Sequence, residues 1–313
     1  MDATRVENEA SMSCATIESH ATESADKLAH SVSLICYGYN EEESIADFFK
    51  RAVDLLDSIV TDYEIVYIDD CSTDGTWPIA QRFAHNNSRI RISRNERNRN
   101  VGYSFKRGVS LAEKEFLFWQ TIDWSYDLSD LRIFLELMDH FGLVVGVRPV
   151  PMRLLAYIPV VRSIYRVRTR SDDFLRAMVS LANYYVLRIL FGLNVHDFQN
   201  IQFHRTKTLQ SFDLRGESSF LGIEMMIRAR SIGLDMIEVP IRFFPRTKGV
   251  SKGIRLHAIW KSCRDIVRNW VSWGWRFRLE GRGNKGRIYR LLEPAFLDEK
   301  VIVLCAPLFK RFR

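Results

Sequence analysis

The chain has 313 residues, of which 47% are hydrophobic and 27% are charged, and its net charge is +7 at pH 7. This length accommodates one large α/β domain or two small ones. No apolar run reaches the roughly 18 residues that a membrane-spanning helix needs, and the opening "MDATRVENEA" lacks the basic and apolar regions of a secretory signal. The five cysteines are scattered and form no Cys-x-x-Cys pair, which disfavours a disulfide framework and a zinc site and indicates a reducing cytosol.

Strands and helices alternate along the chain after a polar N-terminal segment. Residues 1–30 are rich in Ser, Thr, Ala and Glu, which predicts a disordered tail. Buried strands are predicted over 31–39, 63–70, 89–95, 115–123 and 142–148, and helices over 40–59, 76–86, 102–112 and 128–141. This alternation predicts βαβ units and a mainly parallel central sheet with helices on both faces.

The strand at 63–70 ends in two adjacent carboxylates, Asp69 and Asp70. Ligands of open parallel sheets lie beyond the carboxyl ends of the strands, so both side chains are expected to line a cleft. Asp74 and Gly75 predict the turn into the next helix. The alternative for Asp70 or Asp74 is that it caps this helix, but a cap needs only one acid. The absence of a GxGxxG motif after the first strand and of any GxxxxGK[ST] motif disfavours a dehydrogenase-type dinucleotide site and a P-loop.

Several motifs, in order along the chain, resemble those of the family 2 glycosyltransferases. They are "VSLICYGYNEEESI" (32–45), "EIVYIDDCSTDGT" (64–76), "NVGYSFKRG" (100–108), "GVR" (146–148), "LNVHDFQNIQFHR" (193–205) and "FLGIEMMIRARSIGLDMIEVPIRFFPRTKGVSKG" (220–253). The closest resemblance is to the branch that synthesises dolichyl- and polyprenyl-phosphate mannose. It implies an α/β nucleotide-sugar-binding domain of the GT-A type at 31–255, preceded by the tail 1–30 and followed by a basic amphipathic extension at 256–313.

The resemblance also implies roles for individual residues, which fall into three groups. Donor contacts are implied for Tyr39, Glu41, Asp69, Asp70, Gly102, Asp123 and Arg148, with Asp69 or Asp70 accepting hydrogen bonds from the base or ribose. Acceptor or phosphate contacts are implied for Asp197, Arg246, Ser251 and Lys252. Catalytic roles are implied for Asp123, Glu224, Arg246 and Lys252. Arg246 and Lys252 lie in the loop "RTKGVSKG", whose cations would close over the phosphates.

The Asp-x-Asp metal motif of this family is incomplete in the chain. Without gaps, Thr121 aligns with the first Asp and Asp123 with the second, and Asp127 offers a further oxygen. A shifted alignment places Asp123 first and Ser125 second. A divalent ion offsets the charge that grows on a leaving diphosphate, and hard cations prefer oxygen ligands. The resemblance therefore implies Mg²⁺ or Mn²⁺ at Asp123, bound weakly because one carboxylate is missing.

Two interpretations of Glu224 stay open. It lies where family members that glycosylate hydroxyl groups have their general base, and an alcohol needs such a base. A lipid phosphate has its second pKa near about 6, arrives largely ionised and needs none. Glu224 also lies four residues before Arg228, a spacing at which a helix pairs opposite charges.

The region from Arg242 to Arg278 holds ten Lys and Arg residues against one acid, Asp265. Within it, residues 255–278 place Trp, Ile and Val among the basic residues at helical intervals. Such a helix is typical of a membrane interface, and a core-packing helix with a solvated basic face is the alternative. Residues 301–313 are too short to span a membrane.

The sequence predicts an inverting glycosyltransferase that moves a sugar from a nucleotide-diphospho-sugar to a polyprenyl phosphate. We expect it to act as a peripheral protein at the cytosolic face of a membrane. One alternative is transfer to a glycan hydroxyl in surface-polysaccharide or lipopolysaccharide assembly. Another is a weakly catalytic nucleotide-sugar-binding partner subunit. Nucleic acid is not expected as a partner, because the basic stretch carries no recognised motif and strand-end acids would repel a phosphate backbone.

Overall fold

The computed structural model describes residues 27–147, 174–198, 200–218, 220–242, 244, 256–279 and 285–291. Its strands are β1 (Leu28–Gly38), β2 (Val60–Asp69), β3 (Ile90–Arg94), β4 (Phe116–Trp119), β5 (Leu143–Val147), β6 (Ile201–Arg205), β7 (Met236–Pro240) and β8 (Ile288–Arg290). Its helices are α2 (Ile45–Ile59), α3 (Thr76–Asn86), α4 (Asn100–Leu111), α5 (Leu131–Leu137), α7 (Phe174–Phe191), α8 (Thr206–Gln210), α9 (Phe220–Ser231), α10 (Leu256–Asn269) and α11 (Trp275–Leu279), with the π-helical turn η3 (Trp270–Gly274) joining the last two.

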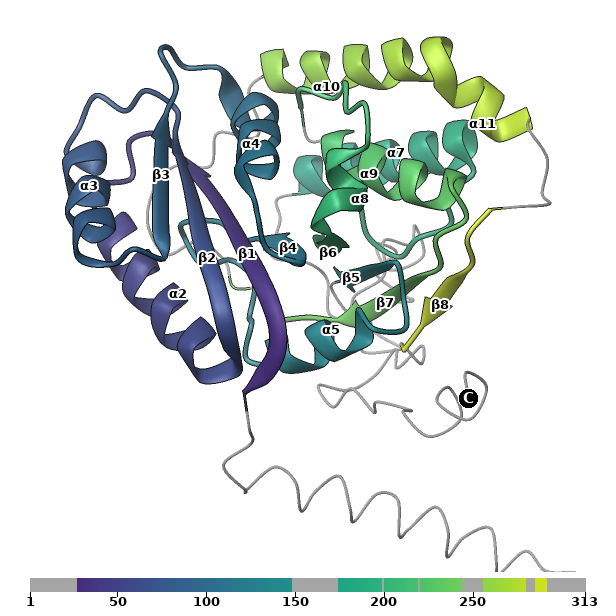
Figure 1. Cartoon of the computed structure of the whole chain (residues 1–313). Helices are drawn as coiled ribbons and strands as arrows, with labels where there is room; N and C mark the ends of the chain where they lie inside the picture. Colours follow the sequence, from purple (N-terminus) through teal and green to yellow (C-terminus); the bar gives the residue numbers. More distant parts are fainter. Residues whose placement is uncertain are drawn as a thin grey trace, which may run out of the picture.

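The strands form one sheet in the order β3-β2-β1-β4-β6-β5-β7-β8 (Figure 1). β1 pairs in parallel with β2 and β4, and β5 pairs in parallel with β7. β6 runs antiparallel between β4 and β5. The mainly parallel sheet expected from the sequence is therefore confirmed, with one reversed strand at its centre. β1 begins at Leu28, three residues earlier than expected.

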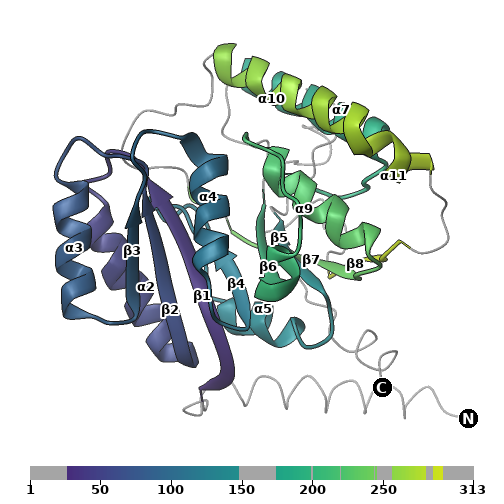
Figure 2. The same cartoon turned by 45° about the horizontal axis from the view of Figure 1, so that its top comes forward.

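Alternate residues of the strands pack on opposite faces of the sheet, as the period of a strand requires. In β4, Phe116 and Phe118 belong to the core under α2 and α5, whereas Leu117 and Trp119 belong to a second core with residues of α4, α8 and α9. A third core joins β5 and β7 to α7, α9, α10 and α11. The helices therefore cover both faces, and α10 and α11 lie over α9 at the end of the molecule remote from α2 and α3 (Figure 2).

The described part of the chain beyond residue 255 contributes to the same sheet. β8 pairs in parallel with β7, and Ile266 and Phe277 of the helices that precede β8 lie in the third core. The predicted domain boundary at residue 255 stays a prediction. The basic C-terminal segment thus packs on the α/β domain along one side of α10 and α11.

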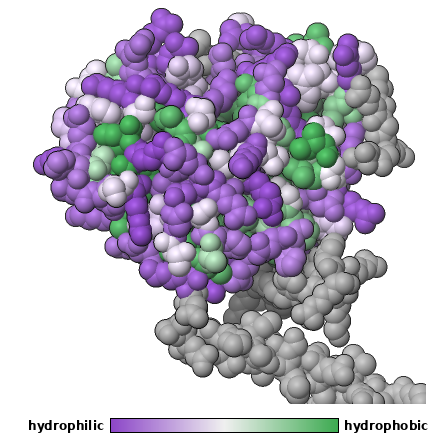
Figure 3. All heavy atoms as spheres, in the orientation of Figure 1, coloured by the Kyte–Doolittle hydropathy of each residue, from purple (hydrophilic) through white to green (hydrophobic). Residues whose placement is uncertain are grey.

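The surface in the view of Figure 3 is mostly hydrophilic, and its hydrophobic atoms form separate small patches. This appearance agrees with the charge content of the chain. Among the described helices, none combines the length and hydrophobicity required to cross a membrane.

A buried carboxylate fastens the amino-terminal edge of the sheet. Glu64 accepts hydrogen bonds from Ser33 Oγ, Glu113 N and Arg91 Nη1, each at 2.6 Å. Burial alone would raise the pKa of Glu64, but these hydrogen bonds and the Arg91 charge outweigh it and lower the pKa below its ordinary value of 4.5. A folded-state pKa below the unfolded one gives stability that is complete above the unfolded pKa and is lost as the pH falls through the folded pKa.

Glu64→Gln is therefore expected to lower the free energy of unfolding by about 2 kcal/mol at neutral pH and by much less below the lowered pKa. Urea denaturation at pH 7 and in acid measures both values. Asp57→Asn is the control, because Asp57 pairs with Arg89 at the surface and should change stability by less than about 1 kcal/mol. An equal loss at both pH values for Glu64→Gln would contradict the assignment.

Candidate functional site

The carboxyl ends of β1, β2 and β4 lie side by side and carry most of the described candidate residues. In the sheet register Gly38, the last residue of β1, pairs with Asp69 of β2. On the other side of β1, Ile122 lies so close to Gly38 that an added Cβ would be 3.0 Å from its Cδ1 atom. The β2 end and the turn that contains Asp123 therefore flank the end of β1, as expected for a site at the carboxyl edge of a parallel sheet.

Asp69 is closed to solvent and organises the loop that follows β2. Its Oδ2 atom accepts a hydrogen bond from Ser72 N at 3.0 Å and lies 3.1 Å from Nε of Arg94 at the end of β3. Arg94 also donates to the Ser72 carbonyl and stacks over Trp77. This carboxylate thus ties the ends of β2 and β3 together.

Asp70 holds the start of α4. Asn95 Nδ2 and Arg99 N donate to its Oδ1 atom at 2.7 and 2.8 Å, and Asn100 N donates to its Oδ2 atom at 2.8 Å. Asn100, the first residue of α4, has a positive φ of 66°. Asn95 is absent from the predicted site residues, although it follows β3 directly and the rule that selects Asp69 and Asp70 would select it. It also donates to Ser104, so one buried network joins β2, β3 and α4.

The loops after β1 and β2 are fastened to each other by side chains. Asn40, with a φ of 56°, donates from its backbone to Ser72 Oγ and accepts from Thr73 N at 2.8 Å. Glu41 N donates to Thr76 Oγ1 at 2.8 Å. The predicted donor contacts Tyr39 and Glu41 thus belong to a loop whose backbone is positioned by the residues that follow Asp70.

Asp74 makes the helix-capping contacts that the sequence left open as an alternative. Its Oδ1 atom accepts from Thr76 N and Thr76 Oγ1 at 3.0 and 2.6 Å. Burial raises the pKa of Asp74, but the hydrogen bonds from Thr76 and Glu42 outweigh it and lower the pKa. Asp74 is therefore a cap of α3, whereas Asp70 holds α4.

The strand predicted over 115–123 ends at Trp119, because the side chain of Gln120 closes a turn. Gln120 Oε1 accepts from Thr121 N at 2.9 Å, and Gln120 Nε2 donates to the Tyr126 carbonyl at 2.7 Å. Within the turn, Ser125 N donates to Thr121 Oγ1 at 3.1 Å and Ser125 Oγ donates to Asp123 Oδ1 at 2.6 Å. Thr121 and Asp123 therefore lie in the same turn, and Ser125 donates a hydrogen bond to each of them.

The oxygen donors of this turn fit a divalent ion that is held largely by its substrate. Within the described residues, no three His, Cys, Asp or Glu side chains are grouped as a metal site. Asp123 offers a carboxylate and Thr121 a hydroxyl, both hard oxygen ligands. Mg²⁺ is commonly bound by one or two carboxylates together with substrate phosphates. The set is therefore compatible with Mg²⁺ or Mn²⁺ that arrives with a diphosphate.

Gly102 lies at a close contact between α4 and the loop at 213–218. A Cβ atom at this position would lie 2.6 Å from Glu217 Cα, so only glycine permits the contact. Lys106 of α4 adds a hydrogen bond to the Leu214 carbonyl. The predicted role of Gly102 in donor binding stays a prediction, and the observed reason for a glycine here is packing against a distant loop.

Glu224 is fully buried in α9, and its carboxylate is surrounded by donors. Arg228 Nε and Nη2 lie 2.9 and 2.7 Å from Oε1, Arg215 N lies within 3.1 Å of both oxygens, and Gly216 N donates to Oε2 at 2.7 Å. The pairing of Glu224 with Arg228, one of the two interpretations of the sequence, is therefore present. The carboxylate positions the loop at 213–217.

Asp197 lies in a buried polar region next to β6. Asn200 Nδ2 donates to the Asp197 carbonyl at 2.6 Å, and Gln202 Nε2 donates to Asn200 Oδ1 at 2.8 Å. His204 follows on the same strand, and burial lowers its pKa to about 3, so its ring is neutral. The contact of Asp197 with an acceptor stays a prediction.

Glu238, which belongs to the sequence motif at 220–253, has a structural role that this motif alone does not reveal. This buried carboxylate accepts from His196 N at 2.6 Å and from Arg290 Nε at 2.9 Å. It thereby ties the loop that contains Asp197 and the strand β8 to β7. Both partners lie about forty or more residues from Glu238 in sequence, so only the fold identifies them.

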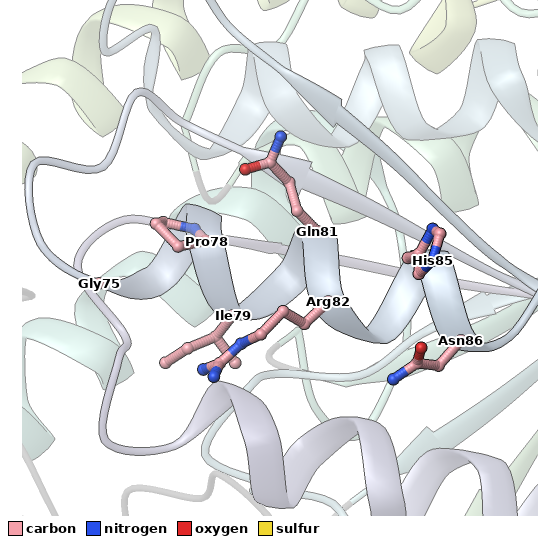
Figure 4. Close-up of a pocket in the computed structure, with 7 residues that line it drawn as sticks. All are labelled: Gly75, Pro78, Ile79, Gln81, Arg82, His85 and Asn86. Carbon is pink, nitrogen blue, oxygen red and sulfur yellow. The ribbon is translucent and has the colours of Figure 1, made fainter.

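A surface hollow runs along α3, apart from the strand-end carboxylates (Figure 4). Its lining consists of Gly75, Pro78, Ile79, Gln81, Arg82, His85 and Asn86. None of these side chains is a carboxylate, and in Figure 4 they project from one helix without converging on a point. The candidate site is therefore placed at the strand ends rather than in this hollow. The predicted residues Arg148, Arg246, Ser251 and Lys252 lie outside the described part of the chain.

Comparison with known proteins identifies relatives along most of the chain. The family model described as "Glycosyl transferase family 2" matches residues 33–179. The undecaprenyl-phosphate mannosyltransferase of Micrococcus luteus is 28% identical over 253 residues, which cover 78% of this chain and 93% of that protein. The polyprenol monophosphomannose synthase of Mycolicibacterium smegmatis is 25% identical over 251 residues, covering 77% and 86%.

Solved structures support the fold. A mannosyltransferase from Pyrobaculum calidifontis, in complex with GDP-mannose and Mn²⁺, superposes with a TM-score of 0.51 at 15% identity, covering 78% of this chain and 64%, just under two thirds, of that chain. Glucosyl-3-phosphoglycerate synthase from Mycobacterium tuberculosis, in complex with phosphoglyceric acid, superposes with a TM-score of 0.52 at 14% identity, covering 78% and 79%. The mixed sheet with helices on both faces is thus that of the GT-A glycosyltransferases. The chain is similar to glycosyl transferase family 2 over residues 33–179.

Proposed function

We propose that the protein transfers a sugar from a nucleotide-diphospho-sugar to a polyprenyl phosphate, with inversion at the anomeric carbon. The observation that carries this proposal is the match to two polyprenyl-phosphate mannose enzymes along 93% and 86% of their own lengths. A single in-line displacement would convert an α-linked donor to a β-linked product. We propose that the reaction takes place at a membrane surface, because a polyprenyl chain resides in the bilayer, and at its cytosolic face, because the scattered cysteines indicate a reducing compartment.

On the donor side, we assign the diphosphate to the turn that contains Asp123. A divalent ion bound there would offset the charge that grows on the leaving diphosphate. Asp123 and the Thr121 hydroxyl would hold it together with the phosphates. Asp69 and Asp70 keep the neighbouring loops in place, and a contact of either with the base or ribose would require the loop at 95–100 or 71–75 to shift, because both residues are almost closed to solvent.

On the acceptor side, the surroundings of Glu224 support a phosphate rather than a hydroxyl. A general base needs an oxygen within reach of the substrate proton, and both Glu224 oxygens already accept hydrogen bonds from the protein. An ionised phosphate attacks without such a base. Arg246, Ser251 and Lys252 remain the proposed phosphate contacts. The missing first Asp of the metal motif is the reason to retain a weakly catalytic binding subunit as the alternative.

Glu224→Gln separates the two roles of this residue. As a positioning residue, it should lower the free energy of unfolding by about 2–3 kcal/mol, because an amide group would face donors, while kcat for a polyprenyl phosphate acceptor falls by less than about tenfold. Arg228→Gln, which removes the same ion pair from the other side, should lower stability similarly. Loss of kcat by about 100-fold or more with unchanged stability would instead show a general base. Thermal unfolding and initial rates measure both quantities.

A screen of donors and acceptors tests the proposed function. Purified protein is incubated with each common nucleotide-diphospho-sugar in the presence of Mn²⁺, and release of the nucleoside diphosphate is measured with a short polyprenyl phosphate, with the unphosphorylated polyprenol, and with glycan acceptors. We expect release that depends on the polyprenyl phosphate. Release with glycans alone would establish the hydroxyl acceptor, and no release with any pair would establish the binding subunit.

A further inference from the structure

The helix α10 and its continuation through η3 and α11 have an inner and an outer face. Ile266 and Phe277 lie in the third core, and the buried Asp265 accepts a hydrogen bond from Glu217 N at 3.1 Å. These contacts attach the inner face to α9 and to the loop at 213–218. The core-packing interpretation of the sequence therefore describes this inner face.

The outer face is apolar and exposed. Trp260, Val267 and Val271 each have an exposed fraction of 60%, and Trp275 one of 39%. Residues seven and four positions apart on a helix lie on the same side, so the first three form one stripe along α10 and into η3. Trp275 follows this stripe at the start of α11. These four residues are called the outer stripe.

The charges beside the outer stripe are all positive within the described side chains of α10 and α11. Arg264, Arg268 and Arg276 are exposed. The Arg264 guanidinium lies 5.3 Å from the ring of Trp260, and that of Arg276 lies 5.4 Å from the ring of Trp275. The described acid of this segment, Asp265, is buried on the inner face and does not contribute to the outer one.

Apolar side chains, tryptophans and arginines in this arrangement match the boundary of an anionic bilayer. Aromatic rings with a polar edge prefer the headgroup level, valines prefer the acyl boundary, and arginines are attracted to anionic headgroups. A solvated helix face would not need three large apolar residues in line. We propose that the outer stripe is the surface by which the protein docks on an anionic lipid membrane, with α10 lying in the plane of the interface.

The same helix is attached to the loop at 213–218, which Glu224 positions, and to the Arg228 partner of Glu224. Asp265 holds Glu217, and Trp273 on η3 lies 4.9 Å from the guanidinium of Arg228, the ion-pair partner of Glu224. A docked α10 would thus keep α9 and the loop at 213–218 next to the bilayer that contains a polyprenyl phosphate. This use of the surface rests on the proposed lipid acceptor, but membrane docking itself can be measured without catalysis.

The experiment is co-sedimentation of the full chain with phosphatidylcholine vesicles, with and without phosphatidylglycerol. Three proteins are compared with the unaltered one. V267E/V271E places two acids in the outer stripe, R264E/R268E reverses the flanking charge, and I232E is the matched control because Ile232 is 57% exposed at the end of α9. Thermal unfolding of each variant verifies that it is folded, and release of nucleoside diphosphate with a short, water-soluble polyprenyl phosphate measures activity away from membranes.

We expect the unaltered protein and I232E to bind the anionic vesicles equally. Binding should weaken at least about tenfold in V267E/V271E and in R264E/R268E, and added salt should weaken binding of the unaltered protein. Activity on the soluble acceptor should be retained in all three variants. The proposal would be overturned if the unaltered protein did not bind anionic vesicles, as expected when a protein partner or a second copy covers the stripe, or if V267E/V271E bound as strongly as I232E. If the unaltered protein bound the vesicles but released no nucleoside diphosphate with the soluble polyprenyl phosphate, the proposed function would be refuted. The proposed docking surface would still stand.

Discussion

Asp123→Asn is expected to lower kcat by at least about 100-fold while leaving the free energy of unfolding nearly unchanged. The neutral amide would keep the shape of the turn and its contact with Ser125, but it would lose the charge assigned to the ion that accompanies the donor. Initial rates at saturating donor, measured over a range of Mn²⁺ concentrations, give the size of the effect. Urea denaturation shows whether the fold is retained.

Asp130→Asn is the matched control, because Asp130 is an exposed acid at the start of α5 outside the turn. It should alter kcat by less than about twofold. Thr121→Asp gives a change in the opposite direction, since it would supply the second carboxylate of the family motif. It is expected to lower the Mn²⁺ concentration for half-maximal activity by about tenfold. Full activity of Asp123→Asn would remove Asp123 from the metal site.

Asp70→Asn is expected to have the largest effect on stability among the strand-end residues. An amide nitrogen would face Arg99 N, Asn100 N or Asn95 Nδ2, so at least one buried donor would lose its acceptor and the charge would be lost for all of them. The free energy of unfolding should fall by about 2–4 kcal/mol. Thermal and urea denaturation measure this loss, and faster hydrogen exchange at the start of α4 would localise it.

The control for this change is Asp74→Asn, which makes the same replacement at an acid in the loop that follows β2. Asp74 caps α3, and Asn is as good a cap as Asp, so its loss should be below about 1 kcal/mol. If Asp70→Asn cost no more than Asp74→Asn, the network around Asp70 would not fasten α4 as described.

The fold class follows from the sequence because the hydrophobic pattern changes its period at each element. β1 and β2 each contain a buried, mostly apolar run, the strands end at Gly38 and Asp69, and the spacing of the apolar residues of α2 has the period of a helix. The order of the strands does not follow in the same way. The antiparallel β6 between β4 and β5, and the addition of β8 to β7, depend on contacts between segments far apart in the chain.

The candidate site can be predicted only in part from the sequence, because it too depends on contacts between segments far apart in the chain. A rule about the carboxyl ends of parallel strands selects Asp69, Asp70 and Asp123. It does not reveal that Asp70 is used to hold α4, because the backbone donors Arg99 N and Asn100 N lie 29 and 30 residues away in sequence. It does not reveal that Gly102 faces Glu217, which lies 115 residues away. Side chains that position a site look, in sequence, like those that bind its ligand.

A crystal structure of the protein with a nucleoside diphosphate and Mn²⁺ is the most direct test of where the donor binds. We predict the diphosphate and the ion at the turn of Thr121 and Asp123, with the base beside the loops that follow β1 and β2. Electron density for the nucleotide along α3 between Gly75 and Asn86, or elsewhere away from Asp123, would contradict the placement of the site at these strand ends.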